Sequence, residues 1–313
     1  MEFGESSLWL IIWRNFELMP LSYQQTPIQE IKDPLLDRAG VSLHIKREDL
    51  NHPYVSGNKW WKLKFNLEEA AKNNCNTLLT FGGAFSNHII ATAAAADELG
   101  FKSIGIIRGE PTSPLNPVLL FAQQKGMELR FISREAYRTK DIPESWRKDT
   151  YVIPEGGSNL LAVKGVEEFC GLLPDTFDFL CCPVGTGGTL SGLIEGVSCQ
   201  KKILGYAVLK HGLLEEEIKR LSEKASAFEN WEIINAYHYG GYAKHTPELI
   251  SFMANFTRAH SVPLDFVYTA KMMAGIFDMV QKGYYQRGTT ILALHTGGTA
   301  INNHVEKLKI IQP

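Results

Sequence analysis

Residues 179–190 read FLCCPVGTGGTL, an apolar run that passes directly into a glycine-rich loop. The run, 179–184, is short and is bounded by Gly185, so it predicts a buried strand, and a helix is expected to begin near Leu190. A strand, a glycine loop and a helix start together present several backbone N–H groups to one point, which suits a phosphate. An ordinary flexible turn is the alternative interpretation.

This loop favours one small phosphate over a nucleotide. It lacks the Gly-Lys-Ser/Thr end of a P-loop, and its third motif glycine, Gly192, comes too late for a dinucleotide-binding motif. ATP and NAD are therefore disfavoured. The residues expected to form the phosphate site are Gly185, Thr186, Gly187, Gly188 and Thr189.

Short apolar runs alternate with helical stretches on both sides of this segment. Such alternation predicts an α/β fold of mostly parallel sheets with flanking helices, in which ligands gather beyond the carboxyl ends of the strands. The expected strands are 77–81, 103–107, 127–132, 179–184, 202–209, 232–236 and 290–294, and the expected helices are 87–99, 116–125, 160–172, 213–223, 247–259 and 269–282.

Composition excludes several classes of partner. The 313 residues carry a formal net charge of −2, so the chain has no basic field that would attract nucleic acid. Five cysteines without CxxC spacing predict reduced thiols in the cytoplasm. Cys181 and Cys182 lie in an apolar run and are expected to be buried packing residues. No cluster of residues has metal-ligand spacing, so no metal is expected.

The first 18 residues are interpreted as a leader outside the core. Residues 7–13 (SLWLIIW) are apolar, but the residues before them include glutamates. A signal peptide would have Lys or Arg in that place. The stretch is also too short to span a bilayer, so no membrane association is expected.

A second cluster, residues 56–59 (SGNK), combines a Gly-Asn turn with Lys59 at the start of an expected helix. The positive end of the helix dipole, and burial beside Trp60, would both disfavour the charged form of the amine. A neutral amine is what Schiff-base chemistry requires. Taken alone, Lys59 is better explained as an exposed lysine in a surface turn, because lysines are mostly exposed.

Further polar clusters follow other expected strands. Residues 81–88 (FGGAFSNH) join a strand to a helix with Ser and Asn at its start, an arrangement that suits a carboxylate or a phosphate but also describes a plain capped helix. Residues 295–298 (HTGG) follow the last strand. Tyr242 and Tyr268 are single tyrosines that would ordinarily pack or form surface hydrogen bonds.

Together and in this order, these motifs resemble the 1-aminocyclopropane-1-carboxylate (ACC) deaminase / D-cysteine desulfhydrase family. The resemblance runs from TPIQEI at residue 26 through HIKRED at 44–49 to HTGG at 295–298. It implies pyridoxal 5′-phosphate as cofactor and fold type II, like the β subunit of tryptophan synthase, with two open, twisted, mostly parallel sheets. It also implies a large lobe of residues 19–61 and 161–313, a small lobe of residues 62–160, and a homodimer.

The resemblance also implies roles for single residues. Lys59 matches the Schiff-base lysine, Asn87 the residue that binds the cofactor's 3′ oxygen, and the 185–189 loop the phosphate cup. Tyr268 matches the tyrosine against the pyridine ring, and Tyr242 a second active-site tyrosine. The carboxylate of the substrate is expected at Ser86, Asn87 and His88, where Ser86 also takes part in proton transfer.

Two positions separate the activities within the family. ACC deaminases carry Glu after the ring-stacking tyrosine and Leu after the late histidine, whereas this chain has Thr269 and Thr296, as the desulfhydrases do. Thr296 matches the hydroxyl that contacts the pyridine nitrogen, and both threonines are expected to contact the cofactor. A neutral hydroxyl makes the ring a weaker electron sink than a carboxylate would, and a weak sink is adequate for loss of a thiolate. The chain departs from the family at Trp60–Trp61.

The expected function is therefore that of a pyridoxal-phosphate-dependent lyase of amino-acid metabolism. D-cysteine desulfhydrase activity, giving pyruvate, ammonia and sulfide, is favoured, with Lys59 releasing the cofactor and moving the α-proton. The alternatives are an ACC deaminase, a β-replacement or racemisation enzyme, and a non-catalytic pyridoxal-phosphate-binding protein.

Overall fold

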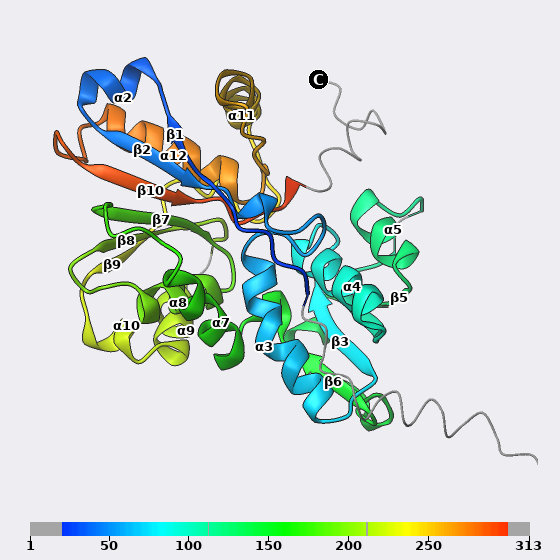
Figure 1. The fold of residues 1–313 in the computed structure, drawn as a ribbon. Helices are drawn as coiled ribbons and strands as arrows, with labels where there is room; N and C mark the ends of the chain where they lie inside the picture. Colours follow the sequence, from blue (N-terminus) through cyan, green and yellow to red (C-terminus); the bar gives the residue numbers. More distant parts are fainter. Residues whose placement is uncertain (1–20, 112, 211, 300–313) are drawn as a thin grey trace, which may run out of the picture.

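The fold consists of two twisted sheets with helices packed between and around them (Figure 1). This computed structural model describes residues 21–111, 113–210 and 212–299. The first sheet has six strands and the second has four. Both are open sheets, and together they form the expected α/β architecture of fold type II.

The six-stranded sheet has the order β1-β2-β10-β7-β8-β9. Strand β1 pairs antiparallel with β2, and every other neighbour pairs in parallel. Its centre is therefore built from strands far apart in the sequence, as expected of helix crossovers. The strands are β1 (Ile28–Ile31), β2 (Ser42–Lys46), β7 (Phe179–Val184), β8 (Lys202–Ala207), β9 (Trp231–Ile234) and β10 (Thr290–Leu294).

The four-stranded sheet has the order β5-β4-β3-β6 and is parallel throughout. Because all four strands run the same way, their carboxyl ends lie at one edge, where the loops after β3 and β4 meet. The strands are β3 (Thr77–Gly82), β4 (Lys102–Arg108), β5 (Met127–Ile132) and β6 (Thr150–Ile153).

Helices cover both faces of the larger sheet, and α3 runs between the two sheets (Figure 1). Helices α2, α11 and α12 lie on one face of the six-stranded sheet, and α7 to α10 lie on the other. The helices are α2 (Pro34–Ala39), α3 (Asn58–Lys72), α4 (Asn87–Leu99), α5 (Pro117–Gln124), α6 (Ala136–Thr139), α7 (Leu160–Cys170), α8 (Gly188–Gly196), α9 (Leu214–Leu221), α10 (Lys224–Ala227), α11 (Pro247–His260) and α12 (Thr269–Gln281), with short 3₁₀ turns η1 (Glu48–Leu50), η2 (Glu144–Trp146) and η3 (Glu155–Gly157).

The two adjacent cysteines are packing residues, as predicted. Successive side chains of a strand point to opposite faces. Cys181 accordingly joins the apolar cluster under α12, and Cys182 joins the cluster under α8. Both are fully buried, and burial raises the pKa of the Cys181 thiol to about 12. Thiols held protonated in this way are poor nucleophiles and poor metal ligands.

The expected helices and strands are all present, with ends that shift by at most three residues. Strands β1, β2 and β6 were not predicted. They have only four or five residues each, and β2 (SLHIK) buries Lys46, so its apolar pattern is broken. The division into two lobes at residues 61/62 and 160/161 stays a prediction. The leader, residues 1–18, lies outside the described residues.

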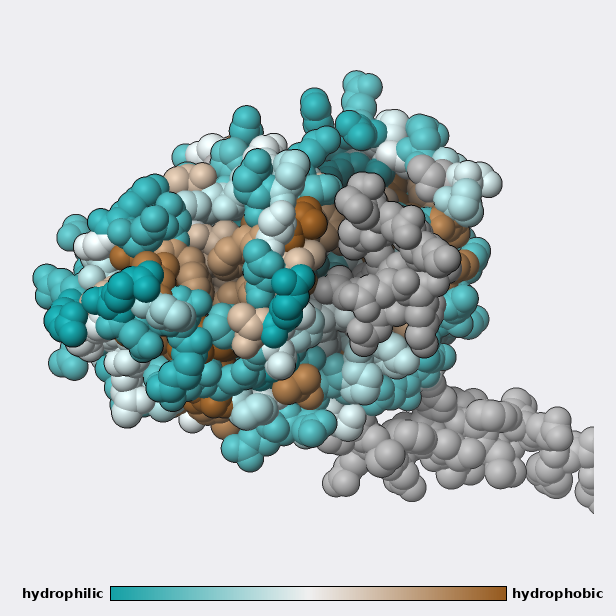
Figure 2. All heavy atoms as spheres, turned by 90° about the horizontal axis from the view of Figure 1, so that it is seen from above, coloured by the Kyte–Doolittle hydropathy of each residue, from teal (hydrophilic) through white to brown (hydrophobic). Residues whose placement is uncertain are grey.

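The visible surface of the described part is mostly hydrophilic, and apolar residues show on it only as separate patches (Figure 2). Within residues 21–299, positions 112 and 211 aside, no helix is both long and apolar enough to cross a membrane.

Candidate active site

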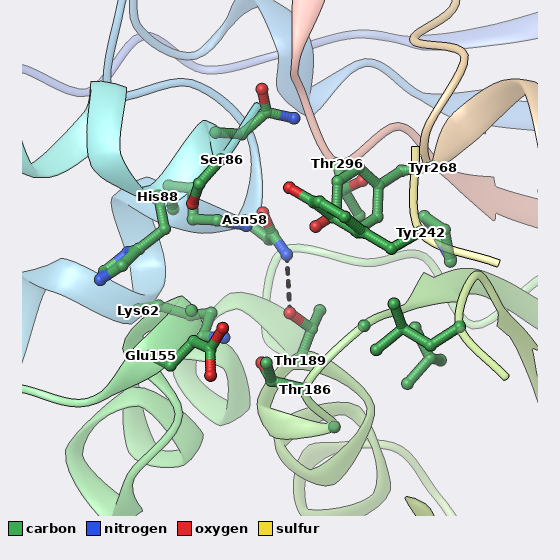
Figure 3. A pocket seen from close by; sticks show the side chains of 18 of the residues that line it. Asn58, Lys62, Ser86, His88, Glu155, Thr186, Thr189, Tyr242, Tyr268 and Thr296 are labelled. Carbon is green, nitrogen blue, oxygen red and sulfur yellow. Dashed lines mark hydrogen bonds between the residues drawn. The ribbon is translucent and has the colours of Figure 1, made fainter. Parts of the chain in front are cut away.

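A cleft at the carboxyl ends of the strands gathers most of the residues that the sequence singled out (Figure 3). Its walls come from the start of α3, the loop between β3 and α4, the loop between β7 and α8, and two tyrosines near α12. The predicted residues that line it are Lys59, Ser86, Asn87, His88, Gly185, Thr186, Gly187, Thr189, Tyr242, Tyr268 and Thr296.

Lys59 stands in the first turn of α3, after a turn that only glycine can form. Gly57 has φ of 69°, and a Cβ there would lie 2.0 Å from the backbone oxygen of Thr296. The Lys59 Nζ donates a hydrogen bond of 2.9 Å to Asn58 Oδ1. Burial lowers the pKa of Lys59 to about 8, against the opposing effect of the Asp265 carboxylate. The neutral amine that Schiff-base chemistry requires is therefore far more abundant near neutral pH than for an ordinary lysine.

The sequence suggested that Trp60 buries Lys59, but in the structure the burial of Lys59 does not come from this neighbour. Trp60 packs against Tyr23, with ring centroids 5.0 Å apart, and its indole N–H donates to the backbone oxygen of Ser22 at 3.0 Å. Because consecutive helix residues point about 100° apart, Trp60 faces the core while Lys59 faces the cleft.

The glycine-rich loop after β7 forms an anion site at the start of α8. Gly187 has φ of 84°, and α8 begins at the next residue. The free N–H groups and the positive end of the dipole therefore face the cleft. Hydroxyl groups complete the loop, since Thr186 Oγ1 lies 2.6 Å from Ser158 Oγ, and Asn58 Nδ2 donates to Thr189 Oγ1 at 2.7 Å.

Lys62 is a second amine at this anion site, and the sequence analysis missed it. It is only 2% exposed and donates to Ser158 Oγ at 3.0 Å. A Cβ at Gly188 would lie 3.2 Å from Lys62 Nζ, so the amine adjoins the glycine loop. Burial, followed by the charge of Lys59, holds its pKa well below the usual range. Its position one helical turn after Lys59 was the available signal, because residues three apart share a helix face.

These features fit a phosphorylated aldehyde. Lys62 forms no ion pair with any carboxylate in the described part of the chain, so a bound phosphate would supply the counter-charge that favours protonation of this buried amine. The glycine loop leaves room for that phosphate, and Lys59 offers the amine that an aldehyde needs. In this site the phosphate would be held by Lys62 and the start of α8, and the aldehyde by Lys59.

The loop before α4 brings Ser86, Asn87 and His88 to the opposite wall. Ser86 is the N-cap of α4, as predicted, and its Oγ accepts a hydrogen bond from Ile89 N at 3.4 Å. The start of this helix is thus a second point that favours an anion such as a carboxylate. Asn87 lies against Asp265, because a Cβ at Gly298 would contact Asn87 Nδ2 at 2.6 Å and Asp265 Cβ at 3.1 Å.

His88 is neutral, and its hydrogen bonds fix which nitrogen carries the proton. Thr80 Oγ1 donates to the backbone oxygen of Ile153 at 2.9 Å, so it must accept from His88 Nε2, 2.8 Å away. Nδ1 is consequently unprotonated, and it is buried without a partner among the described residues. Burial, followed by the charges of Lys59 and Lys62, holds the pKa of His88 well below its usual range.

Tyr242 and Tyr268 lie side by side on one wall of the cleft (Figure 3). Their ring centroids are 6.4 Å apart at an angle of 73°. A Cβ at Gly185 would lie 3.3 Å from Tyr268 Cε1, so this ring lies over the glycine loop. Burial raises the pKa of both phenols above the usual range, so both are hydrogen-bond donors at neutral pH.

Two predicted cofactor contacts do not line the cleft. Thr269 is fully buried, and its Oγ1 accepts a hydrogen bond of 2.7 Å from Asp265 N, so it secures the start of α12. Gly188 faces Ser158 and Lys62, with a Cβ position 2.7 Å from Ser158 Oγ. Thr296 does reach the cleft.

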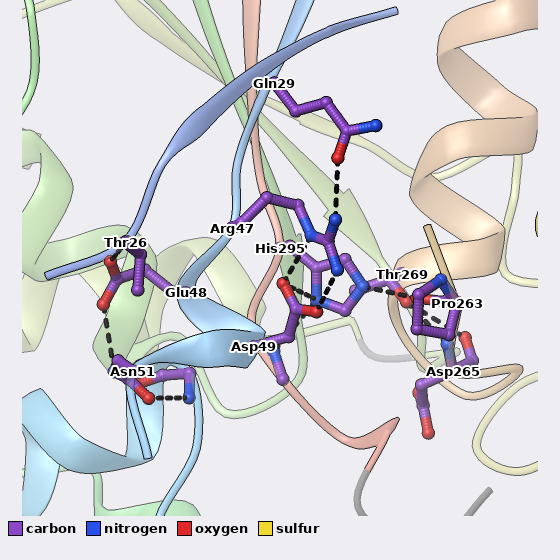
Figure 4. Close-up of polar contacts among 12 residues, drawn as sticks. Thr26, Gln29, Arg47, Glu48, Asp49, Asn51, Pro263, Asp265, Thr269 and His295 are labelled. Atoms are coloured by element: carbon purple, nitrogen blue, oxygen red, sulfur yellow. Dashed lines mark hydrogen bonds and ion pairs between the residues drawn. The ribbon is translucent and has the colours of Figure 1, made fainter. Parts of the chain in front are cut away.

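His295, which precedes Thr296, belongs to a polar network behind the site (Figure 4). Its Nε2 donates to the backbone oxygen of Pro263 at 2.7 Å, and its Nδ1 lies 3.5 Å from Asp49 Oδ1. Asp49 in turn pairs with Arg47 at 2.7 Å. These contacts give His295 a structural role in fixing the end of β10.

A buried lysine with a lowered pKa beside a glycine-rich loop, held between two mostly parallel sheets, is the arrangement of a pyridoxal-phosphate enzyme of fold type II. Residues 19–297 match the family model described as pyridoxal-phosphate dependent enzyme. The chain belongs to this family. The family, the cofactor and the lyase or deaminase class predicted from the sequence are thereby confirmed.

Its relatives carry the names that the sequence motifs suggested. The chain is 32% identical to a Thermotoga maritima protein provisionally named 1-aminocyclopropane-1-carboxylate deaminase, over 89% of this chain and 95% of the relative. It is 31% identical to the bifunctional D-cysteine desulfhydrase/1-aminocyclopropane-1-carboxylate deaminase, mitochondrial, of Arabidopsis thaliana, over 89% of this chain and 77% of that one.

Solved structures agree on the fold. A crystal structure described as an ACC deaminase homologue is 28% identical and superimposes with a TM-score of 0.78, covering 96% of this chain and 98% of the other. A fungal L-serine ammonia-lyase from Rhizomucor miehei shares the fold at 13% identity with a TM-score of 0.65, covering 92% of this chain and 98% of that one.

Proposed function

We propose that this pyridoxal-phosphate-dependent lyase removes the β-substituent of a small amino acid, and that D-cysteine is a substrate. The products are then pyruvate, ammonia and sulfide. The observation that carries this proposal is that Thr296, a residue with a neutral hydroxyl, lines the cleft where the resemblance places the pyridine nitrogen. Glu155 is the carboxylate among the described residues that line the cleft, and it pairs with Lys140 at 2.9 Å.

The bound cofactor supplies an electron sink for the electrons released at the α-carbon. A hydroxyl such as that of Thr296 cannot protonate the sink fully, so it suits a reaction whose leaving group departs readily, as a thiolate does. Opening a cyclopropane ring that has no α-hydrogen would demand a stronger sink. Thr296 lines the cleft with a neutral hydroxyl, and the hydroxyl of Thr269 faces Asp265 N instead of the cleft. Both observations therefore support elimination over ring opening.

The remaining residues act on the substrate directly. The start of α4, with Ser86 and Asn87, holds the α-carboxylate. Lys59, as a neutral amine, accepts the α-proton, and the C–S bond breaks as the thiolate leaves. Tyr242 and Tyr268, both protonated, can donate a proton to that sulfur. The resulting 2-aminoacrylate hydrolyses to pyruvate and ammonia.

The names of the relatives favour a second candidate, deamination of 1-aminocyclopropane-1-carboxylate. A single experiment separates the two. Purified protein is examined for the visible absorption band of the bound cofactor, and is then given D-cysteine or 1-aminocyclopropane-1-carboxylate. Sulfide with pyruvate supports the proposal, and 2-oxobutanoate from the second compound supports the deaminase.

The controls are substitutions on one helix. Lys59→Ala is expected to abolish the band and the activity, while Lys72→Ala, at the exposed end of α3, is expected to change neither. A normal band with no turnover of any amino acid would favour a cofactor-binding protein without activity. A cytoplasmic location and a homodimer stay predictions.

A further inference from the structure

Arg108 is a cation of the cleft that the proposed reaction leaves without a partner. It is the last residue of β4, and its side chain is exposed at the mouth of the cleft, which it helps to line. In the described part of the chain it forms no ion pair, and its guanidinium lies over the ring of Tyr137 at 5.5 Å. A cation at the carboxyl end of a parallel strand stands where such folds bind their ligands.

Arg108 and Tyr242 converge on one point. A Cβ built on Gly83 would lie 3.5 Å from Arg108 Nη2, 3.5 Å from Tyr242 Cε1 and 4.0 Å from the Tyr242 hydroxyl. Gly83 belongs to the same loop as Ser86, three residues earlier, so this point adjoins the proposed α-carboxylate site. A guanidinium and a phenol that meet beside a bound amino acid face its side chain.

The other charges of the cleft are already accounted for. Lys59 would bind the aldehyde of the cofactor. Lys62 and the start of α8 would bind its phosphate. The α-carboxylate has the start of α4. Glu155 cannot neutralise Arg108 fully, because it pairs with Lys140. One guanidinium, which carries a permanent charge and favours planar, bidentate anions, remains for the substrate.

We propose that Arg108 binds a negative charge on the β-substituent of the substrate, so that the enzyme prefers small amino acids with an anionic side chain. A carboxylate, a sulfonate or an ionised thiol would each meet this requirement. The inference rests on the proposed function only in taking an amino acid as the substrate. It adds that Arg108 recognises the substituent on the β-carbon by its negative charge, whether or not that substituent is a leaving group.

Aspartate and asparagine test this preference, because they have nearly the same shape and differ in charge. Neither carries a β-substituent that departs readily, so binding is measured by calorimetry without turnover, with both enantiomers. The wild-type protein is expected to bind aspartate about ten-fold more tightly than asparagine, the difference that one charge-assisted hydrogen-bonded pair provides. Arg108→Gln is expected to bring the ratio to about one, and Arg108→Lys to retain part of it.

Arg134→Gln is the matched control. Arg134 is an exposed arginine two residues after β5 and does not line the cleft, so this variant is expected to keep the wild-type ratio. A wild-type protein without preference for aspartate would overturn the inference. So would an Arg108→Gln variant that loses the same factor for both ligands, because Arg108 would then hold the α-carboxylate.

The same samples separate this inference from the proposed function. A protein that shows the cofactor band and prefers aspartate, but releases no sulfide from D-cysteine, contradicts the proposed substrate and supports the role of Arg108. A protein that releases sulfide but binds both ligands equally contradicts the role of Arg108 alone.

Discussion

Asn58 Nδ2 donates a hydrogen bond of 2.7 Å to Thr189 Oγ1, and so joins the start of α3 to the start of α8. The same side chain accepts a hydrogen bond from Lys59 Nζ through its Oδ1. One buried amide therefore holds the Lys59 amine relative to the glycine-rich loop, the proposed phosphate site. This contact connects two helices that begin 130 residues apart in sequence, at Asn58 and Gly188.

Asn58→Ala is expected to weaken cofactor binding. It removes two hydrogen bonds, each worth about 1 kcal/mol, so the dissociation constant should rise at least about ten-fold. Titration of the cofactor-free protein with pyridoxal phosphate measures it. Asn73→Ala, at the exposed end of the same helix, should leave the constant unchanged. Equal affinities for the two variants would show that Asn58 has no positioning role.

The pKa of Lys59, lowered to about 8, predicts a pH dependence for cofactor capture. Only the neutral amine attacks an aldehyde, and at pH 7 its fraction is about 10% for this pKa but about 0.03% for an ordinary lysine. The rate at which cofactor-free protein gains its visible band should therefore rise with pH and level off above about pH 8. A rate that still rises steeply at about pH 10 would contradict the lowered pKa.

Asp265→Asn tests how Asp265 influences the pKa of Lys59. The Asp265 carboxylate raises the pKa of Lys59, in opposition to burial, so its removal should lower that pKa further. The midpoint of the rate profile should then move to lower pH. Burial raises the pKa of Asp265 itself to about 7, so in the wild-type protein the opposing charge is largely lost below that pH. A midpoint that stays in place, or moves to higher pH, would show that the Asp265 carboxylate does not raise the pKa of Lys59.

Gly57→Ala should destabilise the fold more than Gly100→Ala. Both glycines have positive φ, 69° and 74°, so both substitutions strain the backbone by about 1 to 3 kcal/mol. A Cβ at Gly57 would also overlap the backbone of Thr296, whereas nothing lies within 4 Å of one at Gly100. The fall in melting temperature should therefore be clearly larger for Gly57→Ala. Equal falls would mean that the contact with Thr296 costs nothing.

The sequence predicted the architecture and most of the cleft because both depend on local patterns. Glycine loops that follow apolar strands mark the carboxyl ends of a parallel sheet, and the motifs at Lys59, Ser86 and Gly185 all meet there. The long strands and helices were found for the same reason. The short edge strand β1 and the charged strand β2 carry little of that pattern.

What the sequence could not provide is the set of contacts between distant segments. Asp265 influences Lys59 across some 200 positions, and nothing in its local sequence, PLDFVYT, indicates this. Thr269 was expected at the cofactor, but its orientation depends on the hydrogen bond from Asp265 N at the start of α12. Arg108 was given no role from the sequence, because only the fold brings this strand end beside Tyr242.

The tryptophan pair, which sequence patterns left without a role, belongs to the support of the site. The indole N–H of Trp61 donates to Glu48 Oε2 at 2.7 Å, and Glu48 is fully buried. The backbone oxygen of Glu48 accepts a hydrogen bond from Gly57 N at 2.9 Å, in the turn before Lys59. Trp61→Phe would keep an aromatic ring but remove this donor, and a buried carboxylate that loses a donor costs about 1 to 3 kcal/mol.

Trp60→Phe provides the comparison, since it deletes the same atoms from the neighbouring position. The indole N–H of Trp60 donates to the backbone oxygen of Ser22, an exposed residue whose carbonyl can bind water instead. Urea denaturation should therefore give a larger loss of the free energy of unfolding for Trp61→Phe than for Trp60→Phe. If the two losses were equal, only the volume of the rings would matter. The contact with Glu48 would then contribute nothing to the turn that presents Lys59.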